Sequence, residues 1–99
     1  MVKKHYSEYV RHILRFYTRN LKQPVFNSII SQQNWLVCHS VINRCFPEHK
    51  DVIIAVYQPF DTMGDNVYQA SKAYNIPQDN IWSMMADLER TIAQERGLI

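Results

Sequence analysis

The chain has 99 residues, of which 46% are hydrophobic, 12% aromatic and 20% charged, and its formal net charge is +2. This composition suffices for one small domain with a modest core, and it excludes a disordered chain and a large enzyme. Only two glycines are present, which leaves little turn chemistry for β-hairpins. We therefore expect an all-α fold, with residues 1–99 forming a single domain of four to six helices.

The start of the chain is basic but leads into charged residues rather than an apolar run, so we expect no signal peptide. The longest apolar runs, such as residues 52–57, are far below the ~20 residues that cross a bilayer. We expect a cytoplasmic protein without a membrane partner. Cys38 and Cys45 are seven residues apart, so on one helix they lie ~10 Å from each other, too far for a disulfide. Two cysteines without a disulfide fit a reducing compartment. Both are expected in the core.

Residues 6–20 predict the first helix, because apolar side chains recur there every three or four residues. Its aromatic side chains favour core packing over stacking on nucleic-acid bases. Three arginines recur at every fourth position and therefore lie along one stripe of this helix: Arg11, Arg15 and Arg19. The stripe should face water or a partner, for example the phosphates of DNA.

Pro24 separates this helix from the second, which we place from Asn27 or Ser28 to Arg44 or Phe46. A polar break at residues 31–34 leaves open whether this segment is one helix or two, with Asn34 capping the second. Residues 1–46 thus form the basic N-terminal helices of the domain.

Pro47 ends the second element and opens the third, over residues 48–58. Its apolar run would suit a strand by propensity, but the acidic first turn after Pro47 favours a buried helix. A loop over residues 59–64 follows, and Asp65 or Asn66 is expected to cap a short helix that ends at Tyr74.

The break Asn75-Ile76-Pro77 joins two helices by a very short turn, as a helix-turn-helix requires. We expect a left-handed conformation at Asn75, an apolar plug at Ile76, and the small residue Ser71 where the helices cross. Pro77 opens a long C-terminal helix over residues 78–96 that Gly97 terminates. Its buried face is predicted to hold Ile81, Met84 or Met85, Leu88 and Ile92. The hairpin lies near residues 65–90.

The segment Val67–Trp82 resembles the last helix-turn-helix of sigma-factor region 4 and of the ArpU-RinA type of Gram-positive phage transcription regulators. The family shows alanine where this chain has Ser71, and glycine or asparagine where it has Asn75. It shows serine or threonine at the position of Pro77, and valine at that of Ile81. The resemblance covers about residues 48–97, roughly half of the chain. It implies a small transcriptional regulator that binds double-stranded DNA.

By position in that pattern, the residues facing the major groove are Gln78, Asn80, Trp82 and Ser83, with Asp79 beside them. The helix begins with an acidic residue, and Asp87 and Glu89 precede its first base, Arg90. Affinity for phosphates must then come from Lys72 and the three arginines, or from a protein partner such as RNA polymerase.

The alternative is a non-catalytic interaction module that keeps the hairpin as a scaffold. It would bind an acidic partner through the arginine stripe, or a second copy of the chain through a heptad-like seam on the last helix. An exposed Trp82 would favour an interface. The charge split has two interpretations, because residues 1–50 hold eight Lys/Arg against two acids and residues 51–99 hold three against seven. It marks a binding face, or it lets the two halves complement each other.

Enzyme and metal signatures are weak. The sequence has no glycine-rich phosphate loop and no nucleophile elbow, and its histidines and cysteines lack the paired close spacing of structural zinc sites. We expect no catalytic activity, no metal and no cofactor.

Overall fold

The computed structural model describes residues 6–22 and 24–99, and the chain is helical throughout its regular parts there. Five α-helices and one 3₁₀ turn follow each other along the chain: α1 (Ser7–Arg19), α2 (Ile29–Cys45), η1 (Pro47–His49), α3 (Lys50–Tyr57), α4 (Met63–Tyr74) and α5 (Gln78–Glu95). No strand occurs in these residues, so the predicted all-α fold is confirmed.

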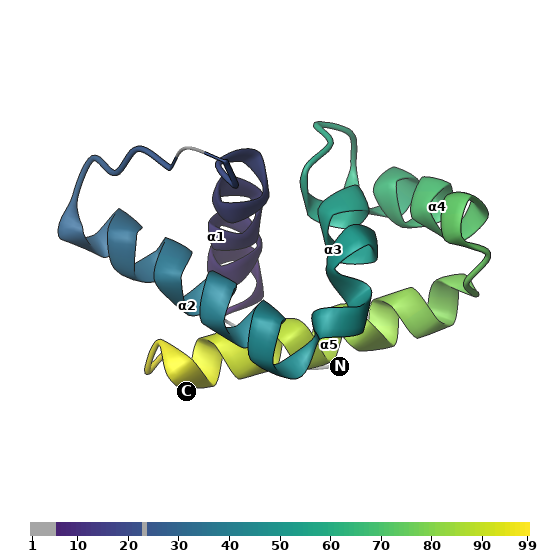
Figure 1. The fold of residues 1–99 in the computed structure, drawn as a ribbon. Coiled ribbons are helices and arrows are strands. Elements are labelled where there is room, and N and C mark those ends of the chain that lie inside the picture. The colour runs from purple at the N-terminus through teal and green to yellow at the C-terminus, as the bar shows by residue number, and fades with distance from the viewer. Residues whose placement is uncertain (1–5, 23) are drawn as a thin grey trace.

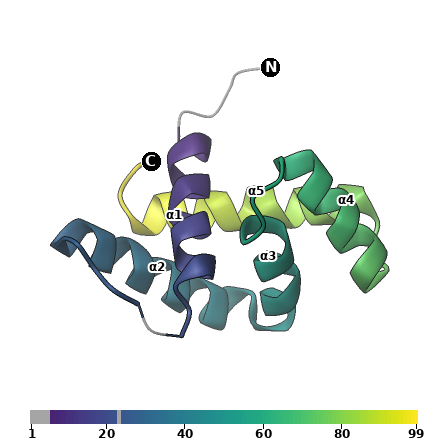
Figure 2. The ribbon, with the colours of Figure 1, turned by 90° about the horizontal axis from the view of Figure 1, so that it is seen from above.

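Helix α5 packs against three of the other four helices, α1, α2 and α4. It runs along the bottom of the molecule in Figure 1, with α4 near its N-terminal end and α2 crossing it toward its C-terminal end. Helix α1 lies across it in the view from above (Figure 2). All five helices contribute to one cluster of buried side chains, including Val10, Leu14, Cys38, Val56, Val67, Met85, Leu88 and Ile92. Both halves of the sequence therefore share one core.

The second segment is a single helix. Ser28 caps α2 by accepting a hydrogen bond from the backbone N–H of Ser31, whose hydroxyl in turn accepts from the N–H of Ser28. Asn34 does not cap a second helix, because it is buried inside α2 and its Oδ1 accepts from Arg96 Nε at 2.8 Å. The expectation of a buried Cys45 is wrong, since this residue sits in the exposed last turn, while Cys38 is buried as predicted.

The third segment forms η1 and α3, so the helical interpretation of residues 48–58 is correct. The cap of α4 is Thr62, three residues before the predicted Asp65: its hydroxyl accepts from the N–H of Asp65 at 3.2 Å. Asn66 is buried within the first turns, where its side chain donates to the carbonyls of Val56 and Pro59. These bonds hold the loop between α3 and α4 against α4.

The α4–α5 connection has the predicted conformation. Asn75 is left-handed, with φ 54° and ψ 48°, and Ile76 packs against the core. Ser71 does more than supply a small side chain, because its hydroxyl donates to the carbonyl of Ile76 at 2.5 Å and its carbonyl accepts from the N–H of Ile76. The turn is thus fixed to the last turn of α4.

The C-terminal end of α5 closes as expected at Gly97, whose φ is +73°. The N–H of Leu98 donates to the carbonyl of Ala93, and that of Gly97 to the carbonyl of Gln94, which is the Schellman pattern. On the inner face Met85 is buried while Met84 is only half-buried. Over residues 6–22 and 24–99, no helix has the length and apolar character to cross a membrane.

Candidate nucleic-acid interface

The first turns of α5 present polar side chains to solvent. Gln78, Asp79, Asn80 and Ser83 are exposed, and Trp82 is 37% exposed. The helix is anchored from behind by Ile81 and Met85, which are buried, so the outer face stands in a fixed orientation. The residues predicted to face the groove thus all lie at the start of α5, but Trp82 is on the side toward α1 and Asn80 on the side toward α3.

A hollow of about 220 Å³ lies between the start of α1 and α5, immediately beside Trp82. It is lined by Tyr6, Ser7, Arg11, Trp82, Ala86 and Glu89. Of the three stripe arginines, only Arg11 lines this hollow. Its place there, next to an exposed aromatic ring on α5, was not predictable from its spacing along α1.

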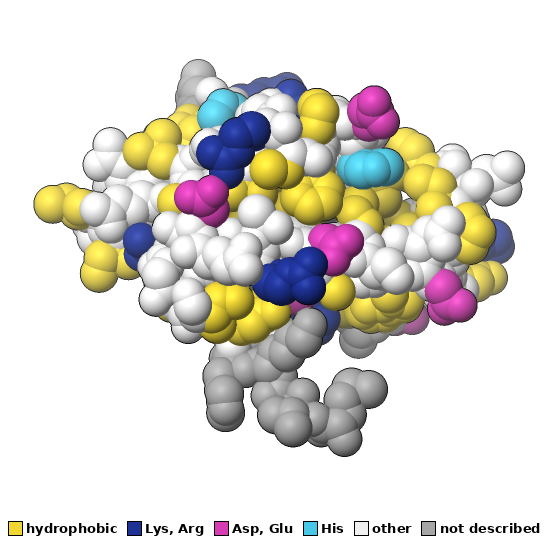
Figure 3. Space-filling model, turned by 90° about the horizontal axis from the view of Figure 1, so that it is seen from below, with side chains coloured by type: hydrophobic (Ala, Val, Ile, Leu, Met, Phe, Trp, Pro, Cys, Tyr) yellow, Lys and Arg dark blue, Asp and Glu magenta, His cyan; other side chains and the backbone are white. Residues whose placement is uncertain are grey.

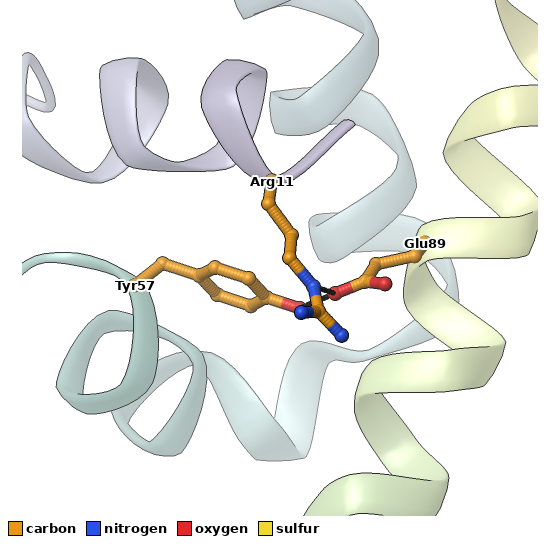
Figure 4. A network of polar contacts seen from close by, with 3 residues as sticks. All are labelled: Arg11, Tyr57 and Glu89. Carbon is orange, nitrogen blue, oxygen red and sulfur yellow. Dashed lines mark hydrogen bonds and ion pairs between the residues drawn. The ribbon is translucent and has the colours of Figure 1, made fainter. Parts of the chain in front are cut away.

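Arg11 is held in this position by a buried carboxylate. Arg11 Nε donates to Glu89 Oε2 at 2.9 Å, and the hydroxyl of Tyr57 donates to the same oxygen at 2.7 Å (Figure 4). The Glu89 side chain is only 4% exposed and that of Arg11 is 26% exposed. Burial, followed by the nearby Glu89 charge, raises the pKa of Tyr57 well above its ordinary value, so the phenol keeps the proton that it donates.

Sequence reasoning missed Glu89 as part of the site. Met85, Glu89 and Ala93 are spaced by four residues and lie on one face of α5, and all three are buried. A carboxylate on an otherwise apolar helix face requires a buried partner, and this was the available signal. The identity of that partner depends on the tertiary fold.

The arginine stripe does not form one free surface. At the far end of α1 from Arg11, Arg19 donates to the backbone carbonyls of Gln58 and Pro59, and its guanidinium stacks 3.7 Å from the centre of the Phe60 ring. Arg15 is half-buried. The expectation that the stripe faces water or a partner therefore holds only in part: Arg19 is exposed although it also contacts the second half of the chain, whereas Arg11 is engaged with Glu89.

The aromatic side chains of α1 mostly support the core. Tyr17 is buried, and Tyr6 and Phe16 are half-buried against the core cluster. Tyr9 is the exception, at 41% exposed. Core packing thus accounts for three of the four aromatic residues on this helix.

Lys72 lies on the exposed side of α4, with its Nζ 5.1 Å from the centre of the Tyr68 ring. On the α3 side of α5, a second hollow of about 380 Å³ is lined by His49, Val52, Ile76, Asn80, Ile81 and Met84. The outer face of α5 is therefore flanked by a hollow on each side, one containing Arg11 and the other His49.

The face of the molecule that is seen from below in Figure 3 carries charges of both signs. Figure 3 shows lysine and arginine side chains that are separated from each other and interspersed with acidic ones. On α5 itself Asp79 and Asp87 are exposed, and Asp87 pairs with Arg90 at 3.1 Å. The start of α5 is thus suited to hydrogen bonding more than to charge attraction.

The predicted self-pairing seam on α5 is not a free surface. Ile81, Met85, Leu88 and Ile92 are each at most 1% exposed, because they pack inside the core of the same chain. Within the described part of the chain, no group of three or more histidine, cysteine or acidic side chains could hold a metal ion.

Comparison of the chain with family models, with curated proteins and with solved structures gives no match. The resemblance to sigma-factor region 4 stays a prediction from the residues of the hairpin. The function must be argued from the site itself.

Proposed function

We propose that this protein is a small transcriptional regulator that binds double-stranded DNA through the first turns of α5. The observation that carries the proposal is the left-handed turn at Asn75, which presents the start of α5 as an outer helix with exposed Gln78, Asn80 and Ser83. Glutamine and asparagine pair with adenine in the major groove, and serine bonds to any base edge. A helix in this arrangement enters the groove with its N-terminal residues first.

Two cations flank this helix start and are suited to contact phosphates. Lys72 is exposed on α4. Arg11 keeps its Nε on Glu89 while it lines the hollow next to Trp82, so the carboxylate would orient its guanidinium toward the DNA backbone. The remaining stripe arginines, Arg15 and Arg19, are assigned no phosphate contact. Few cations and two exposed carboxylates predict weak affinity with a shallow dependence on salt.

The test is fluorescence anisotropy of the full chain with a mixed-sequence duplex over a salt series. We expect binding near 50 mM salt and a log-log slope of about two, one unit for each phosphate contact. Lys72→Glu should lower the slope by about one. Arg44→Glu is the matched control, because it changes the net charge equally but lies on α2 beside Glu95, at the other end of α5. Asp79→Asn should strengthen binding.

Absence of binding at low salt would refute the proposal. Equal losses in Lys72→Glu and Arg44→Glu would show that only net charge matters, and would remove α5 as the binding element.

The second candidate is the protein-interaction module, and one observation favours it. The exposed carboxylates of α5 and the engaged arginines of α1 disfavour a nucleic acid, whereas the outer face of α2 up to residue 43 is uncharged and partly apolar. Such a face suits a protein partner rather than a nucleic acid.

A further inference from the structure

The outer face of α2 differs from every other exposed helix face in the described residues. Residues 23–43 contain no aspartate, glutamate, lysine or arginine. The α2 side chains in this range that are open to solvent are Ile29, Ile30, Gln32, Gln33, Leu36, His39 and Ser40. Ile29 is 72% exposed, Ile30 59% and Leu36 49%. These large aliphatic groups lie in water although the helix buries its other face in the core.

More exposed aliphatic side chains gather at the same end of the molecule. Val25 precedes α2 and is 71% exposed, and the chain ends with exposed Leu98 and Ile99. Arg96, just before them, bonds to Asn34 of α2, and the C-terminus and the first turns of α2 share the end of the molecule opposite α4 (Figure 1). An apolar surface of this kind indicates an interface.

The spacing of the side chains makes this face complementary to itself. Ile29, Gln33, Leu36 and Ser40 follow each other by four, three and four residues, and so form one stripe. In an antiparallel pair of α2 helices, Ile29 of each copy meets Leu36 of the other, and glutamines meet between them. Beside Leu36, a hollow of about 150 Å³ lined by Leu36, Val37, Ser40, Val41 and Glu95 can receive the incoming side chain.

We infer that α2 is a homodimer interface in which two copies of this chain pair antiparallel through the Ile29–Leu36 stripe. Charge favours a second copy: the stripe carries no charged side chain, so the same stripe on another copy brings none against it, and Glu95 in the adjacent hollow is already paired with Arg44 of its own chain. A two-fold contact uses the stripe and the hollow twice. It also leaves the α4–α5 hairpin free, because α4 lies at the other end of the molecule (Figure 2).

The test is sedimentation equilibrium of the full chain over a wide concentration range. One helix pair buries less than the roughly 1,200 Å² of a standard interface, so we expect a weak dimer whose apparent mass rises with concentration from one chain of 11.8 kDa toward two. Ile29→Lys or Leu36→Glu alone should weaken association by about ten-fold or more. Both positions are exposed, and far-UV circular dichroism checks that each variant stays helical.

Mixing the two variants tests the antiparallel arrangement. The mixed pair would place the new lysine of the Ile29→Lys copy against the new glutamate of the Leu36→Glu copy. It would also keep one native contact between Ile29 and Leu36, so association should recover. Tyr74→Lys, an exposed change on α4, is the control and should dimerise like the original chain. A chain that stays monomeric at all concentrations overturns the inference, as do variants that associate normally or a mixture that shows no recovery.

Discussion

The Glu89 carboxylate joins the two halves of the chain at a single atom. Its Oε2 accepts hydrogen bonds from Arg11 of α1 and from Tyr57 of α3. In the described residues, every buried side-chain nitrogen or oxygen has a hydrogen-bond partner, so loss of this acceptor would create a defect that the native fold lacks.

Glu89→Ala should therefore destabilise the protein by about 2–3 kcal/mol, because it leaves a buried phenol and a largely covered guanidinium without their acceptor. The value lies below that of a fully buried pair because Arg11 keeps some contact with water. Urea unfolding measures the change. Glu95→Ala is the control, since its pair with Arg44 is half-exposed and should contribute less than about 1 kcal/mol. Equal losses in both variants would contradict the role of burial.

The Cys38 thiol makes the fold sensitive to alkali. Burial raises its pKa from an ordinary value of 9.0 to about 12, while the Arg96 charge opposes the shift. Between these values the unfolded chain has released the proton and the folded chain still holds it, so the free energy of unfolding falls as pH rises. The slope is at most about 1.4 kcal/mol per pH unit.

Cys38→Ala should make the decline in stability between about pH 9 and 10 shallower without abolishing it, because buried Tyr57, whose pKa is also raised from an ordinary value of 10.0, adds to the decline toward pH 10. Urea unfolding at several pH values gives the slope of each variant. Cys45→Ala should keep the original slope, because Cys45 is exposed. An unchanged slope in Cys38→Ala would show that other groups cause the loss.

At the scale of the elements, the turn between α4 and α5 depends on one backbone conformation. Asn75 is left-handed and exposed. Asn75→Ala should cost about 1 kcal/mol in the free energy of unfolding, because a Cβ without a compensating polar group disfavours positive φ. Asn75→Gly should be close to neutral. Gln69→Ala, at an exposed helical position of α4, should change stability by less than about 0.5 kcal/mol, and a similar loss there would attribute the effect to α4 as a whole.

Local signals in the sequence predicted the elements well. The helix starts at Ser28 and after Pro77 and the helix end at Gly97 follow from residue types whose conformational preferences are intrinsic. The predicted start of α4 came too late in the sequence, because Thr62, Asp65 and Asn66 can all cap a helix. The choice among them depends on the bonds of Asn66 to Val56 and Pro59, which only the folded chain provides.

The candidate site was predictable to the same extent. Exposure of Gln78, Asn80 and Ser83 follows from the helical period of α5, since its apolar positions lie on the opposite face. The partners of Arg11 and Arg19 were not predictable, because they lie 78 and about 40 residues away along the chain. Spacing on one helix indicates which side chains share a face, but not what that face contacts.

Across the whole molecule, the two oppositely charged halves complement each other. Arg11–Glu89 and Arg44–Glu95 each pair a base from the first half with an acid from the second. The Arg96–Asn34 bond adds a third connection, between α2 and the residue that follows α5. Because α5 packs against α1, α2 and α4, unfolding of either half would expose the core of the other.

The protein should consequently unfold in one transition, and the two tryptophans allow a test because each half holds one. Trp35 is buried beside Tyr17 and donates to the carbonyl of Asn20, while Trp82 lies on α5 next to α1. Trp35→Phe leaves the reporter in the second half and Trp82→Phe leaves the one in the first. In each variant the urea midpoint from fluorescence should coincide with that from far-UV circular dichroism, which follows all helices together. Separate midpoints would mean that the halves are stable independently, and that the shared core along α5 contributes little to their stability.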